Sequence, residues 1–387
     1  MSQPVPSRYH ALDSLRATMM FLGIVLHAMV AYMRGSPWLI RPLEQTTFFQ
    51  PAVFFIHAFR MPVFYAVAGF LTALLLERYG WRRAIMNRFW RIAVPFALGC
   101  VLLVPLMFFL SAASKVGAER AWQYIVSGRF LAHAHPIHLW FLEYLLLLYV
   151  LAAVLVVGIA VLPEKARRMG LAAFRYGLQA VWAPLPLAVL TYVTLLPMKW
   201  PGLDDPPSFA PTPHILVAYA VPFFFGWLLY HARDLLDVLN RRAWFYGVLG
   251  AALGVAYVVL IFTISRPVMS GIYPVRAVLA LAMWCLIFGI TGLFLRYGSG
   301  HSPLWRYLCD SSYFIYLAHL PVMLALQLML FYAPLPAVAL APIVLVVTTI
   351  VLLPVYAYAV RPTFVGALLN GRRYPPTIWP AAVAAAS

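Results

Sequence analysis

Long apolar runs alternate with short polar stretches along the chain, and the runs have the length of membrane crossings. A transmembrane helix needs about 20 consecutive, mostly apolar residues. The segments that meet this requirement are 12–33, 49–76, 91–113, 139–162, 176–197, 213–230, 243–264, 272–295, 312–332 and 335–360. The pattern predicts an all-α polytopic membrane protein, a bundle of about ten transmembrane helices. It assigns residues 1–365 to a single helical domain and residues 366–387 to a cytoplasmic tail.

The composition supports this topology and explains the charge of the chain. Hydrophobic residues make up 64% of the 387 positions and charged residues only 10%, whereas soluble domains carry about 25% charged residues. The formal net charge is +17, and most Lys and Arg residues lie in alternate loops, such as 78–91 and 165–175. The positive-inside rule places these loops and both termini in the cytoplasm. Because membrane topology accounts for the charge, membrane lipid is an expected partner and nucleic acid is not.

Three ionisable residues interrupt the first apolar run. Asp13, Arg16 and His27 are costly at membrane depth unless they are paired or face water, so they are candidates for a functional site. Arg16 and His27 are eleven positions apart, which places them on one helix face within about 20° and about 16 Å apart along the axis. Asp13 can pair with Arg16 at i, i+3. The run therefore predicts a polar stripe that reaches from the inner surface well into the membrane.

A second group of candidates is expected in the outer half of the membrane. The second span enters from the opposite side, so His57 and Arg60 should reach a depth similar to that of His27. A neutral imidazole at this depth can act as a general base towards a hydroxyl group. In the ninth span, Tyr316 and His319 are three positions apart and can face the bundle interior together. These residues form either a reaction site or buried hydrogen-bonded packing pairs.

Arg88 and Arg91 form a candidate anion site at the start of the third span. Their i, i+3 spacing in the first helical turns predicts that both side chains point the same way. Guanidinium groups bind phosphates through paired hydrogen bonds, so this pair suits a phosphate-bearing ligand at the cytoplasmic surface. The alternative is an ordinary basic anchor that contacts lipid headgroups.

The loop before the fourth span is rich in histidine. His133, His135 and His138 have no metal-ligand spacing, and a proline between the last two interrupts any shared helix face, so no metal is expected. His138, Trp140 and Glu143 lie at the mouth of the span. They can line a groove for an acceptor molecule, with the indole as a sugar-stacking face, or they can belong to a plain interfacial aromatic belt.

These residues resemble a known family. Arg16, ten intervening residues and His27 resemble the defining motif of the integral-membrane acyltransferase-3 family, and Arg88-Phe-Trp-Arg91 resembles that family's Arg-x-x-Arg at the start of the third span. The resemblance extends over about residues 8 to 360. Four further segments are similar to the branch of the family that is linked to succinylation of osmoregulated periplasmic glucans. They are 57–65, 138–142, 221–226 and 311–321.

The resemblance implies a bacterial inner-membrane O-acyltransferase that needs no metal. It would move an acyl group, succinyl in this branch, from cytoplasmic acyl-CoA to a periplasmic glucan or another saccharide. In that scheme Arg88 and Arg91 hold the CoA phosphates, and Arg16, oriented by Asp13, lies nearer the thioester. His27 deprotonates the sugar hydroxyl, and Arg60 is the candidate to bind the free carboxylate of a succinyl donor. The residues expected to bind or orient substrates are Arg60, His57, His138, Trp140, Glu143, Tyr316 and His319.

Two other classes of protein stay open at this point. A transporter or flippase for a polar or lipid-linked saccharide would use the buried charges to line its route, although the two halves of the chain show no matching pair of broken helices. A non-catalytic membrane subunit of a glucan-synthesis complex would need the same residues for stability alone. The sequence does not identify the acyl group or the acceptor sugar. It also leaves open whether the acyl group is transferred directly or through an acyl-enzyme intermediate, and whether the protein is a homo-oligomer.

Overall fold

The computed structural model describes residues 9–264, 269–300 and 302–377. Its long helices are α1 (His10–Ala31), α2 (Gln50–Arg88), α3 (Val94–Val116), α5 (Trp140–Ala160), α8 (Pro213–His231), α10 (Ala243–Thr263), α11 (Met269–Tyr297), α12 (Pro303–Met329) and α13 (Ala337–Val355). Shorter helices are α4 (Ala118–Val126), α6 (Glu164–Gln179), α7 (Pro184–Leu195), α9 (Leu236–Arg241) and α14 (Phe364–Asn370), together with the short 3-10 segments η2 (Arg129–His133), η3 (Ile137–Leu139) and η4 (Arg233–Leu235). Two π-helical segments, η1 (Phe89–Ala93) and η5 (Tyr356–Val360), complete the set. No β-strand occurs in the described ranges, and the all-α prediction is confirmed.

Eight helices in the described part of the chain are long and apolar enough to cross a membrane. One of them, Gln50–Val116, carries the two predicted spans 49–76 and 91–113. It is broken at Gly80, where φ is 72°, a conformation that glycine adopts at little cost. The predicted span 176–197 is also not one helix, because α6 and α7 meet at an angle of 109°. The first helix ends at Gln179, where Ala180 is extended, and the second begins at Pro184, because proline is well tolerated in the first turn of a helix.

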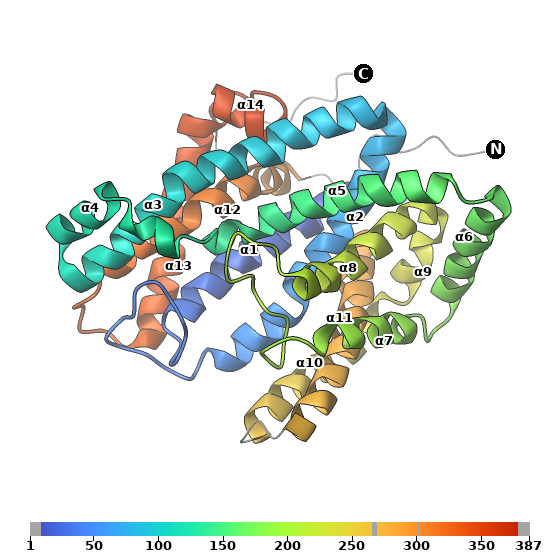
Figure 1. Ribbon diagram of the computed structural model, residues 1–387, viewed down its shortest axis with the longest axis horizontal. Helices are drawn as coiled ribbons and strands as arrows, with labels where there is room; N and C mark the ends of the chain where they lie inside the picture. Colours follow the sequence, from blue (N-terminus) through green and yellow to red (C-terminus); the bar gives the residue numbers. More distant parts are fainter. Residues whose placement is uncertain (1–8, 265–268, 301, 378–387) are drawn as a thin grey trace.

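The helix α1 lies in the middle of the bundle, in contact with α2, α11, α12 and α13 (Figure 1). Its most apolar window is 56% buried, against 28% for the span Ile137–Ala160 that contains α5. The polar residues of the first span are therefore surrounded by protein on several sides. The position of α1 explains how ionisable side chains are accommodated within an apolar segment.

The helices α2 and α8 cross with their backbones in direct contact. A Cβ atom on Gly226 would lie 1.8 Å from the backbone oxygen of Ala66, and one on Gly69 would lie 1.8 Å from that of Phe223. Glycine at both positions thus allows the close approach that is typical of membrane helix pairs. Because α2 carries Arg60, this crossing also holds one wall of the site described below.

We expect the substitution Gly226→Ala to destabilise the protein by about 1–3 kcal/mol, because the added methyl group forces the two backbones apart. Gly158→Ala is the matched control, since a Cβ atom at that helical position meets nothing within 4 Å. Thermal unfolding of the two detergent-purified variants would measure the difference. Equal midpoints for both variants would contradict the importance of this crossing.

The chain after η5 folds back onto the bundle. Helix α14 contacts η1 and α12, and the Asn370 side chain donates a hydrogen bond to the Tyr356 hydroxyl at 2.7 Å. Part of the segment predicted as a tail, from 366 to 377, thus packs against the helices, and residues 378–387 lie outside the described part. We call the end of the bundle that contains α14 and the first turns of α1 and α12 the α14 end.

Candidate active site

A pocket lies between α1, α2, α12 and the beginning of α5, and its empty volume is about 380 Å³. Four polar side chains reach it from separate elements: His27, Arg60, His138 and Tyr316. The remaining lining residues are apolar or aromatic, namely Met19, Met20, Met61, Phe64, Trp140 and Phe141. We call this space the His27 pocket.

His27 and His319 form a hydrogen bond whose donor and acceptor nitrogens can be assigned. His319 Nδ1 faces the backbone oxygens of Ile315 at 3.1 Å and of Tyr316 at 2.7 Å. Because a carbonyl oxygen only accepts, this nitrogen carries the proton, and Nε2 of the neutral ring is an acceptor. His27 Nδ1 then donates to His319 Nε2 at 2.8 Å. His27 is left with Nε2 as its unprotonated ring nitrogen, which is the form that a general base requires.

His138 and Tyr316 close the pocket beside this pair. The Tyr316 hydroxyl donates to the backbone oxygen of His138 at 2.7 Å, and the His138 Nε2 donates to the backbone oxygen of Leu317 at 3.2 Å. The His138 ring packs edge-on against the His319 ring, with centroids 5.3 Å apart. All three side chains are at most 7% exposed. These bonds fix the start of α5 against α12 and hold the imidazole pair in place.

Arg60 is a partly buried cation at the pocket. Its Nε is buried with no hydrogen-bond partner among the described residues, and its electrostatic interactions include one with the carboxylate of Asp205. A Cβ atom on Gly23 would lie 2.6 Å from Arg60 Nη1, so a glycine in α1 makes room for this side chain. A guanidinium with an unpaired nitrogen beside a pocket suits a ligand that carries negative charge.

Three of the seven residues predicted to bind or orient substrates are absent from the lining of the His27 pocket: His57, Glu143 and His319, which reaches the pocket only through its hydrogen bond with His27. His57 Nε2 donates to the backbone oxygen of Leu203 at 2.9 Å, which anchors the loop between α7 and α8. Glu143 is also absent from the lining; its Oε2 is buried without a hydrogen-bond partner in the described ranges, and the carboxylate interacts electrostatically with Cys100 of α3. Trp140, in contrast, lines the pocket and packs on the Tyr219 ring at a centroid distance of 5.5 Å.

A second cationic group lies nearer the α14 end. Arg16 Nη2 pairs with Asp13 Oδ1 at 3.6 Å, and the guanidinium of Arg91 interacts electrostatically with those of Arg16 and Arg88. The phenol of Tyr313 also interacts with Arg91. The structure thus gathers the three arginines of the two sequence motifs in one region.

The expectation that Arg88 and Arg91 share the first turns of a new helix is wrong. The helix resumes directly after Gly80, so Arg88 ends a helical segment and Arg91 lies inside the π-helical η1. A π-helix has more residues per turn than an α-helix, so i, i+3 neighbours no longer point the same way. Arg88 Nη2 donates to Thr72 Oγ1 at 3.3 Å, whereas Arg91 Nε and Nη2 donate to the backbone oxygen of Leu369 at 3.1 and 2.8 Å.

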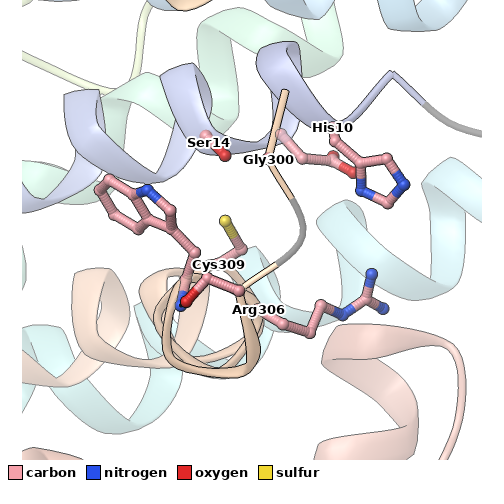
Figure 2. Close-up of a pocket in the computed structure, with 8 residues that line it drawn as sticks. His10, Ser14, Gly300, Arg306 and Cys309 are labelled. Atoms are coloured by element: carbon pink, nitrogen blue, oxygen red, sulfur yellow. The ribbon is translucent and has the colours of Figure 1, made fainter. Parts of the chain in front are cut away.

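A second pocket opens at the α14 end between the first turns of α1 and α12, with an empty volume of about 320 Å³ (Figure 2). Figure 2 shows Ser14 and Cys309 facing it from the two helices, with Arg306 at its edge. Its complete lining is His10, Asp13, Ser14, Gly300, Ser302, Trp305, Arg306 and Cys309. Both pockets therefore lie along the same two helices, α1 and α12.

Several residues in or near these sites were not predicted from the sequence. The methionines that line the His27 pocket, Met19 and Met20 in α1, have no polar signal and were part of an apolar run. Tyr149 was also missed, although its ring lies 5.0 Å from Arg88 Cζ. Buried Arg276, which donates to the backbone oxygens of Leu196, Met198 and Trp200, organises the loop near Arg60. An arginine within a predicted span was the available signal for this last residue.

Metal ligands are not clustered in the described ranges: no group of three or more His, Cys, Asp or Glu side chains there could hold a metal ion. The chemistry that the His27 pocket can support is proton transfer by a partly buried imidazole beside a fixed cation. The imidazole of His27 suits the activation of a hydroxyl group for attack, and the guanidinium of Arg60 suits the stabilisation of negative charge.

Comparison with known proteins identifies the class. The family described as an acyltransferase domain, acyltransferase 3, matches residues 9–357. The chain belongs to this family, as the sequence motifs predict, and it is a multi-pass membrane acyltransferase.

Similar proteins within the class carry a more specific name. Glucans biosynthesis protein C of Salmonella paratyphi B is 26% identical to the chain over 337 residues, which cover 84% of this chain and 84% of that protein. The proteins of the same name from Salmonella dublin and Salmonella enteritidis give the same values. No solved structure gives a significant match.

Proposed function

We propose that the protein is an inner-membrane O-acyltransferase that moves an acyl group from cytoplasmic acyl-CoA to a hydroxyl group of a periplasmic glucan or related saccharide. Family membership supports acyl transfer, and the name of the similar Salmonella proteins supports a glucan as the acceptor. Succinyl is the acyl group that we assign, because the pocket is lined by a partly buried arginine, Arg60, that can bind its second carboxylate.

The observation that carries this proposal is the directed pair of His27 and His319. It supplies a base whose unprotonated nitrogen, Nε2, belongs to a residue that lines the His27 pocket. His27 Nε2 takes the proton of the sugar hydroxyl while the oxygen attacks the thioester carbonyl. The carbon–sulfur bond then breaks, and the CoA thiolate recovers the proton from the imidazolium. His319 accepts the hydrogen bond of His27 Nδ1 throughout and stabilises the charged ring.

The donor would approach from the α14 end, which we assign to the cytoplasm in agreement with the basic loops. Arg16, Arg88 and Arg91 make this region positive, and Asp13 orients Arg16. Such a region attracts the phosphates of CoA, which cannot enter hydrocarbon. The apolar methionines and the Trp140 indole of the His27 pocket would accommodate the acyl group and the sugar face. His57 would act through the loop that it anchors, and Glu143 has no assigned contact with substrate.

The test is an assay of the purified protein in lipid nanodiscs with succinyl-CoA and a periplasmic glucan. We expect release of free CoA thiol that depends on the presence of glucan, together with succinylated glucan in the mass spectrum. A saccharide that crosses proteoliposome membranes without any thiol release would instead identify a transporter. Thiol release that is equal with and without glucan would remove the saccharide acceptor from the proposal.

A further inference from the structure

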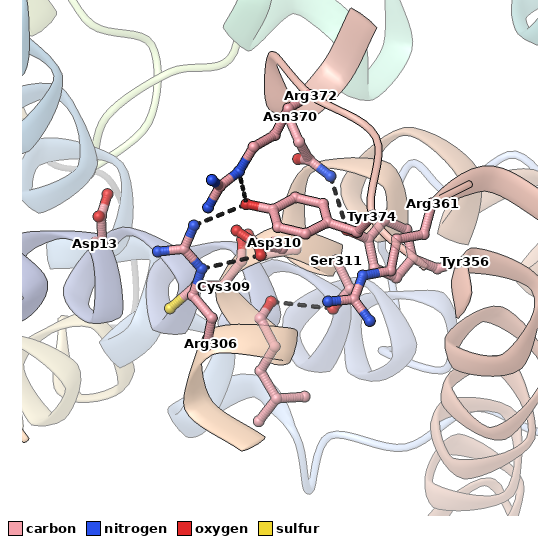
Figure 3. A network of polar contacts seen from close by, with 12 residues as sticks. Asp13, Arg306, Cys309, Asp310, Ser311, Tyr356, Arg361, Asn370, Arg372 and Tyr374 are labelled. Atoms are coloured by element: carbon pink, nitrogen blue, oxygen red, sulfur yellow. Dashed lines mark hydrogen bonds and ion pairs between the residues drawn. The ribbon is translucent and has the colours of Figure 1, made fainter. Parts of the chain in front are cut away.

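Three arginines gather around Tyr374 at the α14 end (Figure 3). Arg306 Nη2 donates to the Tyr374 hydroxyl oxygen at 2.9 Å, and Arg372 Nε donates to the same oxygen at 2.7 Å. Figure 3 shows these two side chains converging on the phenol from different elements. Arg361 lies against the face of the ring, with its Cζ 4.9 Å from the centroid. We call these four residues the Tyr374 cluster.

The positive charge of the cluster is only partly compensated. Asp310 Oδ2 accepts from Arg306 Nε at 3.0 Å, and this carboxylate is 8% exposed. Arg361 is 3% exposed. Its guanidinium donates to the backbone oxygen of Thr377 at 2.8 Å and lies over the rings of Tyr307 and Tyr374. Its Nε is buried and has no hydrogen-bond partner within the described ranges. No carboxylate of the described residues forms an ion pair with Arg361. Because a buried guanidinium without a counter-ion is strongly disfavoured, the arrangement indicates a site for an anion.

Local backbone features build this arrangement. Arg361 directly follows the π-helical η5, and π-helical segments occur frequently at functional sites. Gly371 ends α14 in the left-handed conformation, with φ at 81°, which is the usual glycine-based helix end. The chain then turns back, so that the Tyr374 amide donates to the backbone oxygen of Arg361 at 3.2 Å. These features hold Tyr374 among the arginines.

The cluster adjoins the route that the donor would use. Arg306 also lines the pocket at the α14 end, which Asp13 shares, and Asp13 pairs with Arg16. Arg91, in contrast, already uses two of its nitrogens to bind the carbonyl oxygen of Leu369. Arg91 therefore has fewer N–H groups available to bind a phosphate than the sequence predicted. The Tyr374 cluster has more of them.

We propose that the Tyr374 cluster binds a phosphate group at the nucleotide end of the donor, an inference that rests on the proposed use of acyl-CoA. Phosphate oxygens would take the acceptor position that the phenol oxygen now holds between Arg306 and Arg372, and Arg361 would supply further charge from below the ring. Paired guanidinium groups are well suited to this geometry. A phospholipid headgroup carries the same chemistry, so the test has to distinguish the two sources.

The test measures binding of adenosine 3′,5′-bisphosphate, which is the nucleotide end of CoA without its thioester, to the full-length protein in phosphate-free detergent. We expect the compound to raise the thermal midpoint of the unsubstituted protein, and its dissociation constant to increase at least tenfold in Arg361→Gln. Arg373→Gln is the matched control, because this neighbouring arginine is exposed. Unchanged affinity in Arg361→Gln, or no binding to the unsubstituted protein, would overturn the proposal.

A kinetic comparison separates this proposal from the proposed function. We expect Arg361→Gln to raise KM about tenfold for succinyl-CoA and to leave kcat/KM for succinyl-pantetheine, which has no phosphate, unchanged. An equal loss with both donors would overturn the phosphate role and show a structural one. If added phospholipid alone stabilises the protein through Arg361, and the bisphosphate does not, the ligand is a lipid headgroup and the proposal fails. Bisphosphate binding without any acyl transfer would contradict the proposed function instead.

Discussion

Replacing His27 with alanine is expected to lower the rate of saccharide acylation by about 10²–10⁴-fold, the contribution that a general base typically makes. The reason is the directed hydrogen bond from His27 Nδ1 to His319 Nε2, which leaves His27 Nε2 unprotonated at the pocket. Glucan-dependent release of CoA thiol by the purified variant would measure the loss. Because the imidazole is removed without any change of charge in the neutral state, insertion into the membrane should be retained.

Two comparisons make the result for His27 specific. His133→Ala is the matched control, because this histidine is exposed in η2 and lies outside the pocket lining. His319→Gln should retain more activity than His319→Leu, since the amide oxygen can accept the hydrogen bond that His27 donates. A His27→Ala protein of normal melting temperature that still acylates glucan at nearly the original rate would end the proposed mechanism.

The contrast between α1 and the C-terminal segment shows how much of the site could be predicted from the sequence. The polar stripe of α1 was predictable because ionisable residues stand out within an apolar run and helical spacing is regular. The pairing of Asp13 with Arg16 at i, i+3 followed from the same local rule. The match of the family to residues 9–357 likewise agrees with motifs that can be read directly from the chain.

Contacts that depend on the path of the backbone were not predictable. Arg91 donates to the carbonyl oxygen of Leu369, which is 278 positions away. No local sequence pattern predicts a partner at that distance. The direction of its side chain depends on a π-helical segment, which has no clear sequence signal. The apolar pattern predicted a loop between the spans 49–76 and 91–113. In the structure the chain is helical on both sides of a single break at Gly80. The Tyr374 cluster requires the chain beyond residue 366 to fold back onto the bundle, whereas the apolar pattern only assigned residues 366–387 to a cytoplasmic tail.

The arginine at the His27 pocket should determine which acyl donor the protein uses. Arg60→Gln is expected to lower kcat/KM for succinyl-CoA by about a hundredfold, in the range expected for loss of a hydrogen bond between charged groups. Acetyl-CoA has no second carboxylate, so its kcat/KM should change much less, and the preference between the two donors should decrease. Arg41→Gln, a substitution of an exposed arginine in the loop between α1 and α2, is the control. An equal loss with both donors would instead assign Arg60 to the developing oxyanion, because that charge is common to every thioester.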